Sequence, residues 1–170
     1  MNAQAVANAQ ILESKKSDIR YKNGRTLRAS ASKLLADARR KELEHSAILS
    51  DNMIADGQTR PGDVAAHHIV SWSDPPAFDS QQLLFGWGIG INDVDNGAYL
   101  PRFKKTVVDT LPNARKHSPP HTYIYHAQVY GRLLRIEPER KHSETARKTL
   151  RNIKAELVAG TFPYRKEHLV

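Results

Sequence analysis

The stretch Ala65-Ala66-His67-His68-Ile69-Val70 decides how the middle of this chain is interpreted. Two histidines stand side by side within a run of small and apolar residues. A second block follows, Asp95-Asn96-Gly97-Ala98-Tyr99-Leu100-Pro101, and then a third, His117-Ser118-Pro119-Pro120-His121. Short apolar runs bounded by turn residues are typical of strands. We therefore expect two short strands, over 64–70 and 97–101, with histidines gathered near their ends.

The histidine pair predicts a division of labour. Adjacent side chains on a strand point to opposite faces, so His67 and His68 cannot both bind one ion from a regular strand. Cleaving a phosphodiester needs an activated water and stabilisation of charge on the phosphate and the leaving oxygen, and a divalent cation supplies the stabilisation. A neutral imidazole can accept the proton of the water, because its ordinary pKa is about 6.5. One histidine should hold a metal ion while the other faces the water.

Composition restricts the chemistry of such a site. The chain has 170 residues, enough for one domain with a real core, and 26% of them are charged. Cysteine is absent, which excludes disulfides and thiolate ligation of zinc. A metal ion must therefore be held by histidine, carboxylate or asparagine. No apolar run approaches the length that spans a bilayer, and no membrane insertion is expected.

Charge is distributed unevenly along the chain, whose formal net charge is +8. Residues 51–101, which contain the histidine pair, hold one basic and seven acidic side chains. Residues 1–50 hold ten basic and five acidic side chains, and residues 102–170 hold fifteen and six. Basic flanks attract a polyanion such as nucleic acid, whereas acidic groups near the pair favour cations. The alternative is that lysine and arginine only solvate helices.

Helical periodicity dominates the rest of the chain. We expect helices over 2–14, 26–49 and 79–87, another that starts with Ser118 as N-cap, and a last one carrying a stripe of Ala146, Leu150, Ile153 and Leu157. The predicted fold class is mainly α with a small two-stranded β element. The expected organisation is a helical N-terminal extension (1–60), a core (61–137), and a C-terminal helix and tail packed on the same domain (138–170). Helices must supply most of the burial, because two strands are too few for a sheet core.

The helix expected to start at Ser118 would carry two histidines on different faces. His121 shares the inward face of Tyr125, Val129 and Leu133. His126 lies about 140° further around such a helix and should point elsewhere.

These blocks together resemble the HNH, or ββα-metal, nuclease superfamily, and most closely its AHH branch of bacterial toxin domains. The resemblance covers residues 65–135. It is carried by Ala66-His67-His68-Ile69-Val70, Gly88-Ile89-Gly90-Ile91-Asn92, Asp95-Asn96-Gly97-Ala98-Tyr99-Leu100-Pro101, and His117 to His121 with Tyr125.

The resemblance implies a role for each matching residue and a ββα-metal core embedded in helices. His67 would bind one divalent metal ion, with Mg²⁺ or Mn²⁺ favoured over Zn²⁺ or Ni²⁺, and His68 would be the general base. Asn96 would pin the loop that orients the base. His121, together with His117, would complete the metal site. The candidate substrate contacts are Lys104, Lys105, Arg115, Lys116 and the hydroxyl of Tyr125.

The function expected from this resemblance is a metal-dependent endonuclease toxin that cleaves DNA. Such a domain would be injected by a specialised secretion system, would act in the cytoplasm of a competing bacterium, and would have an acidic cognate immunity protein as partner. The start of the sequence lacks the layout of a cleavable signal peptide, which agrees with this expectation. Two alternatives remain: an RNA-cleaving toxin of the same fold, and a non-catalytic, zinc-stabilised helical domain that binds nucleic acid.

Overall fold

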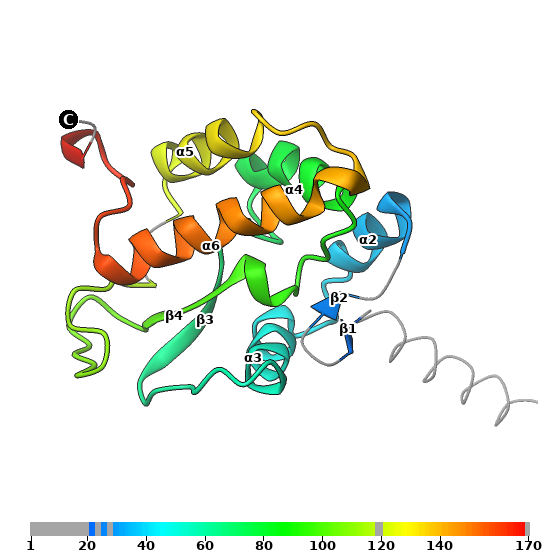
Figure 1. Ribbon diagram of the computed structural model, residues 1–170. Coiled ribbons are helices and arrows are strands. Elements are labelled where there is room, and N and C mark those ends of the chain that lie inside the picture. The colour runs from blue at the N-terminus through cyan, green and yellow to red at the C-terminus, as the bar shows by residue number, and fades with distance from the viewer. Residues whose placement is uncertain (1–20, 23–24, 27–28, 118–120, 169–170) are drawn as a thin grey trace, which may run out of the picture.

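The computed structural model describes residues 21–22, 25–26, 29–117 and 121–168, and over them the protein is mainly helical (Figure 1). None of the helices in these residues is long and apolar enough to cross a membrane. Short 3-10 turns occur at Pro75–Ala77, Val94–Asn96, Arg140–His142 and Lys166–His168. The helices and strands are β1 (Tyr21–Lys22), β2 (Arg25–Thr26), α2 (Ala31–Ala38), α3 (His45–Ala55), β3 (Val64–His68), α4 (Phe78–Gly86), β4 (Gly97–Pro101), α5 (Tyr123–Leu133) and α6 (Ser143–Ala159).

The antiparallel ribbon of β3 and β4 stands at the centre of the fold. Its register pairs Val64 with Pro101 and His68 with Gly97. Both expected strands are present, although β3 ends two residues earlier than the sequence predicted. Gly97 is required here by close approach, since a Cβ would lie 2.7 Å from Met53 Sδ and 2.8 Å from a methyl carbon of Leu49. Helix α3 therefore packs directly on the start of β4.

The two faces of the ribbon bury different cores, because side chains alternate along a strand. One face packs against α3, where Val64, Ala66 and Tyr99 meet Leu49 and Met53 in a small apolar cluster. The other face joins the larger core, which α4, α5 and α6 complete. Figure 1 shows α3 and α6 on opposite sides of the ribbon. His67 and His68 consequently face different surroundings.

The apolar stripe predicted for the last helix is confirmed. Ala146, Leu150, Ile153 and Leu157 of α6 are all fully buried. Helix α6 ends at Gly160, whose positive φ of 73° makes it a left-handed C-cap. The predicted fold class, mainly α with a small β element, is therefore correct.

The single helix expected over 26–49 was wrong. The chain forms the β1–β2 pair, then α2, and then α3, with an irregular segment over 39–44. That segment consists of good helix formers, so helix propensity does not explain the break. His45 Nε2 donates to the carbonyl of Arg40 at 3.1 Å, which folds the segment back on the first turn of α3. The helix expected over 2–14 lies outside the described residues.

The expected helix start at Ser118 was also wrong. Helix α5 begins at Tyr123, and its N-cap is Thr122, whose hydroxyl accepts from the backbone N–H of Tyr125 at 3.1 Å. Ser118 itself lies outside the described residues. His121 therefore lies before the helix, and the angular argument that separated it from His126 does not apply.

Candidate active site

The histidines singled out from the sequence gather where β3 ends, beside the N-terminus of α5. His67 is central, and the ring centroids of His121 and His117 lie 4.7 Å and 5.4 Å from that of His67. His68 lies next along the strand but faces the α3 side. The site therefore has two parts, one on each face of the ribbon.

His67 presents one free nitrogen to the first part. The hydroxyl of Tyr125 donates to the carbonyl of Ile69 at 2.9 Å, so it can only accept from His67 Nε2, also at 2.9 Å. The proton of the neutral imidazole is then on Nε2, and Nδ1 carries a lone pair. Among the described residues Nδ1 has no hydrogen-bond partner, although it is buried. Burial and the neighbouring histidines lower the pKa of His67 well below its usual value, so this lone pair is available at neutral pH.

A cluster of Asp74, His121 and His126 completes the first part. One ligand atom from each residue lies within 4.8 Å of the others. His121 Nδ1 is 2.6 Å from Asp74 Oδ2 and His126 Nε2 is 3.6 Å from it. That oxygen is buried but makes no aligned hydrogen bond among the described residues. The expectation that His126 points away was wrong, because α5 starts later than predicted.

This donor set fits a divalent metal ion. Imidazole nitrogens and a carboxylate oxygen converge on one volume. Among the described residues the buried Asp74 Oδ2 and His67 Nδ1 make no aligned hydrogen bond, which is costly unless a cation or water satisfies them. Asp74, His121 and His126 form the group of closest ligand atoms, and the rings of His67 and His117 lie beside this group but outside it. Within the part of the chain that the structure describes, the Nδ1 atoms of both His67 and His117 are buried without a hydrogen-bond partner.

His68 forms the second part on the opposite face. Its Nε2 is 2.9 Å from Asn92 Oδ1, and Asn92 Nδ2 is 3.0 Å from Nδ1 of His45. Burial lowers the pKa of His68 to about 3, although the hydrogen bond with Asn92 opposes the shift. The imidazole is neutral at physiological pH and is therefore able to accept a proton.

Asn96 fastens the chain that follows the histidine pair. Its Oδ1 accepts from the N–H of Val70 at 2.8 Å, and its Nδ2 donates to the carbonyls of Val70 and Ile91 at 3.1 Å and 2.8 Å. The side chain is completely buried. This geometry matches a residue that pins the loop beyond β3, whereas Asn92 is the one that touches His68.

Sequence reasoning missed two residues that the structure places in direct contact with the histidines. Asn92 was named only as part of a block that carries the resemblance, without a role, and Asp74 was not singled out. The sequence signal for Asp74 was an acidic residue ahead of Pro75-Pro76, six positions after the pair. Other acidic residues of the middle segment are not at the site, since Asp93 and Asp95 form ion pairs with Arg147 of α6 at 2.8 Å and 2.7 Å.

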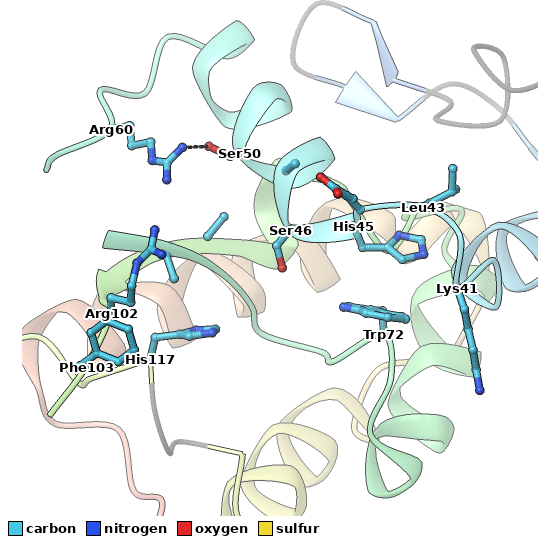
Figure 2. Close-up of a pocket in the computed structure, with 14 residues that line it drawn as sticks. Lys41, Leu43, His45, Ser46, Ser50, Arg60, Trp72, Arg102, Phe103 and His117 are labelled. Carbon is cyan, nitrogen blue, oxygen red and sulfur yellow. Dashed lines mark hydrogen bonds between the residues drawn. The ribbon is translucent and has the colours of Figure 1, made fainter. Parts of the chain in front are cut away.

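An open groove of about 690 Å³ begins at His117 and runs along the α3 side (Figure 2). Figure 2 shows Arg102 and His117 at one end, and His45, Trp72 and Lys41 at the other. Arg60 closes its upper edge, where it donates to Ser50 Oγ at 3.4 Å. Three basic side chains, Lys41, Arg60 and Arg102, therefore line a cavity that reaches His117 at the edge of the histidine cluster.

The predicted substrate contacts divide into free and engaged side chains. Lys104 and Lys105 are exposed. Lys116 donates to the carbonyl of Thr106 at 2.6 Å, and Arg115 donates to the carbonyl of Phe162 at 3.0 Å. Tyr125 is fully buried, so its hydroxyl orients His67 and cannot reach a phosphate.

The chain has the strand pair, the following helix and the histidine-rich site of an HNH-type nuclease. Residues 48–157 match the model of a family described as AHH, a nuclease family of the HNH/ENDO VII superfamily with conserved AHH. The match covers well over half of the sequence, so the chain belongs to the AHH family, and Ala66-His67-His68 supplies its AHH sequence. No curated protein and no solved structure matches the chain.

The buried neutral histidines predict that the metal-free protein loses stability in mild acid. The pKa values of His67 and His68 are lowered in the folded state, so below about pH 6.5 the unfolded chain takes up protons that the folded chain does not. The resulting loss of stability is negligible above the pKa of histidine in the unfolded chain. It grows as the pH falls from that pKa toward the lower pKa of the folded state. At about pH 5.5 the burial of His68 should lower the free energy of unfolding by roughly 1 kcal/mol, and the burial of His67 should add to that loss. Denaturant unfolding at about pH 7.5 and 5.5 measures the difference.

The His142→Gln variant is a control for this measurement, because His142 is partly exposed and pairs with Glu137 outside the site. Between about pH 7.5 and pH 5.5 its free energy of unfolding should decrease by as much as that of the wild type. Equal stability of the wild type at the two pH values would contradict the prediction.

Proposed function

We propose that this chain is a metal-dependent endonuclease that hydrolyses phosphodiester bonds of DNA. The observation that carries the proposal is the opposite placement of two neighbouring imidazoles. The His67 ring lies beside an Asp/His/His cluster, 4.7 Å from the ring of His121, and its Nδ1 has no hydrogen-bond partner among the described residues. His68 is held neutral on the other face of the strand. Membership in a nuclease family makes a nucleic acid the substrate class.

Asp74, His121 and His126 are the residues proposed to hold the ion, with His67 Nδ1 beside them. When bound, a divalent cation stabilises negative charge on the phosphate and on the leaving oxygen. The carboxylate suits Mg²⁺ or Mn²⁺, and the imidazoles also suit Zn²⁺ or Ni²⁺. We favour Mg²⁺ or Mn²⁺.

The remaining residues position groups and move a proton. In this proposal His68 accepts the proton of the attacking water on the ring nitrogen that carries no proton. Tyr125 keeps the proton of His67 on Nε2, which holds Nδ1 free for the ion. Asn96 holds Val70 in place, so the loop after the pair keeps both rings in position.

The groove of Figure 2 supports a polyanionic strand as substrate. Its basic side chains, Lys41, Arg60 and Arg102, can contact phosphates on the way to the histidines. The exposed Lys104 and Lys105 extend the positive surface beyond Arg102. Contacts to phosphates do not distinguish deoxyribose from ribose, so RNA is the alternative substrate. A cleavage assay with both nucleic acids separates DNA from RNA as substrate.

Replacing the proposed base should abolish cleavage. His68→Ala removes the proton acceptor and leaves the metal cluster and the basic groove in place, so the rate should fall by more than about 100-fold. The measurement is nicking of supercoiled plasmid with Mg²⁺ or Mn²⁺, with and without chelator, in parallel with total RNA. His142→Ala is the matched control and should cleave like the wild type.

Each outcome of that assay decides one part of the proposal. Near wild-type nicking by His68→Ala would refute the assignment of the base. Cleavage of RNA alone would refute DNA as substrate, and activity unaffected by chelator would refute metal dependence. DNA binding without cleavage by the wild type would favour the non-catalytic alternative.

Metal binding should depend on the residues that the structure adds to the site. Asp74→Asn and His126→Ala each remove one of three converging ligand atoms, so Mn²⁺ should bind at least about 10-fold more weakly. Calorimetry of Mn²⁺ binding without DNA measures this directly. His142→Ala should bind as the wild type does. Unchanged affinity in both Asp74→Asn and His126→Ala would place the ion elsewhere.

We further propose that the chain is an antibacterial toxin domain, delivered by a specialised secretion system to the cytoplasm of a target cell. A nuclease without self-discrimination would damage the genome of its producer, so an inhibitor is needed. The many basic side chains of residues 102–170 favour an acidic immunity protein, because opposite charge also speeds association.

Expression in the bacterial cytoplasm tests this role. The wild type should stop growth and His68→Ala should be harmless, because only the former cleaves DNA. Co-expression of the open reading frame beside the natural gene should restore growth, and its product should co-purify in a complex that high salt weakens. A wild type that is harmless without any partner would refute the toxin role, even if it cleaves DNA in vitro.

A further inference from the structure

A row of hydrogen-bonded groups leads away from His68 on the face opposite the metal ligands. His68 Nε2 lies 2.9 Å from Asn92 Oδ1, Asn92 Nδ2 lies 3.0 Å from His45 Nδ1, and His45 Nε2 lies 3.1 Å from the carbonyl oxygen of Arg40. The row ends on a backbone carbonyl, which can only accept. Its last member therefore determines the direction of every bond before it.

The proton positions follow one after another from that carbonyl. His45 must donate from Nε2, so the Nδ1 of its neutral ring is an acceptor. Asn92 must then offer its NH₂ group to His45, which turns its carbonyl oxygen toward His68. His68 can satisfy that oxygen only by donating from Nε2, and the nitrogen left without a proton is Nδ1.

We propose that His45 is a positioning residue that acts through Asn92 to hold His68 in the Nε2–H tautomer, so that Nδ1 is the nitrogen that accepts the proton of water. The proposal rests on the nuclease function proposed above. His45 lies before the residues 48–157 that match the family, so the match assigns it no role.

The surroundings hold this row rigidly. His45, Asn92 and His68 are all buried. Asn52 Nδ2 donates to the backbone carbonyl of Asn92 at 2.8 Å, and Trp72 packs on the His45 ring with centroids 4.7 Å apart. Figure 2 shows these two rings beside each other at the end of the groove. A side chain fixed on several sides can transmit a tautomeric preference, because it cannot rotate to reverse its bonds.

A purely structural role for His45 makes a different prediction. A histidine that only fills space would affect the stability of the fold, and its loss would leave the His68 proton where it is. The location of that proton therefore separates the two roles. It can be observed without metal, substrate or turnover.

Nitrogen-15 NMR of histidine-labelled, metal-free protein at neutral pH is the first measurement. Long-range correlation between ring nitrogens and carbon-bound protons distinguishes an Nε2–H from an Nδ1–H imidazole. The wild type should show His68 as the Nε2–H tautomer. An Nδ1–H tautomer would overturn the proposal without any variant.

Two variants of His45 form a matched pair. His45→Asn keeps an acceptor near the Nδ1 position, so the tautomer of His68 should be unchanged. His45→Gln places its amide near the Nε2 position and loses the acceptor for Asn92, so the tautomers should mix. On plasmid, His45→Gln should lower kcat by about 10-fold with little change in KM, since a base with its proton on the wrong nitrogen is inactive. His45→Asn should retain most activity.

The tautomer of His68 and the cleavage of nucleic acid test different parts of the proposal. If His45→Gln leaves the Nε2–H tautomer unchanged, His45 is not a positioning residue, whether or not the protein is a nuclease. If the tautomer shifts as expected but neither DNA nor RNA is cleaved by the wild type, the proposed function fails and the row of hydrogen bonds stands. If His45→Gln does not fold, the wild type and His45→Asn remain as tests, and an Nδ1–H imidazole of His68 in either of them would overturn the proposal.

Discussion

The side chain of Asn96 is the constraint on which the rest of the site depends. The ribbon of β3 and β4 has only five residues in each strand, and its ladder would end at His68 and Gly97. Asn96 extends it with three side-chain hydrogen bonds to Val70 and Ile91, and its own carbonyl accepts from the N–H of Ile69 at 2.8 Å. A ribbon so short gains little from strand pairing alone. Asn96 thus fixes where the ribbon ends, and the alternation of side chains along β3 places the two histidines on different faces.

Both histidines of the pair are oriented by the same device, used once on each face. In each case polar side chains connect the imidazole to a backbone carbonyl by hydrogen bonds. Tyr125 connects His67 to the carbonyl of Ile69. Asn92 and His45 connect His68 to the carbonyl of Arg40. A carbonyl accepts without carrying charge, so each relay holds a neutral ring and fixes its proton on Nε2. A carboxylate in the same place would favour the imidazolium and raise the pKa. Burial of neutral rings lowers stability in acid, and in exchange two nitrogens with lone pairs are available at neutral pH. The one carboxylate among these contacts, Asp74, stands beside His121 and His126, where a cation is expected.

Local periodicity was enough to predict the elements that bury one regular face. The strand 97–101 and the stripe of α6 follow from alternation and from four-residue spacing, and both are present. The features that were missed depend on particular side-chain contacts and not on periodicity. Residues 39–44 favour a helix by propensity, yet they form turns, and the side chain of His45 bonds back to the carbonyl of Arg40. Thr122 and not Ser118 caps α5, and a shift of that start by a few residues reverses the prediction for His126. Asp74, Asn92 and His45 come from a loop, a turn and a helix start, and no spacing rule relates them to the histidine pair. The residues that carry the AHH resemblance could be read from the sequence, whereas those that surround them could not.

The position of His45 also bears on where the functional unit begins. The first 60 residues were expected to form a helical extension, and a boundary at residue 60 stays a prediction. Helix α3 belongs to that stretch, yet Leu49 and Met53 fill the small core on one face of the ribbon and touch the position of Gly97. The same helix supplies Asn52 and His45, which hold Asn92 from two sides. A ribbon without α3 would expose Val64 and Ala66 to water and leave Asn92 free to rotate. The side chains proposed to bind the ion come from the ribbon, the loop after it and α5, whereas the hydrogen bonds proposed to orient His68 as a base come from α3. On this proposal the catalytic unit extends back at least to the carbonyl of Arg40, beyond the segment that matches the family.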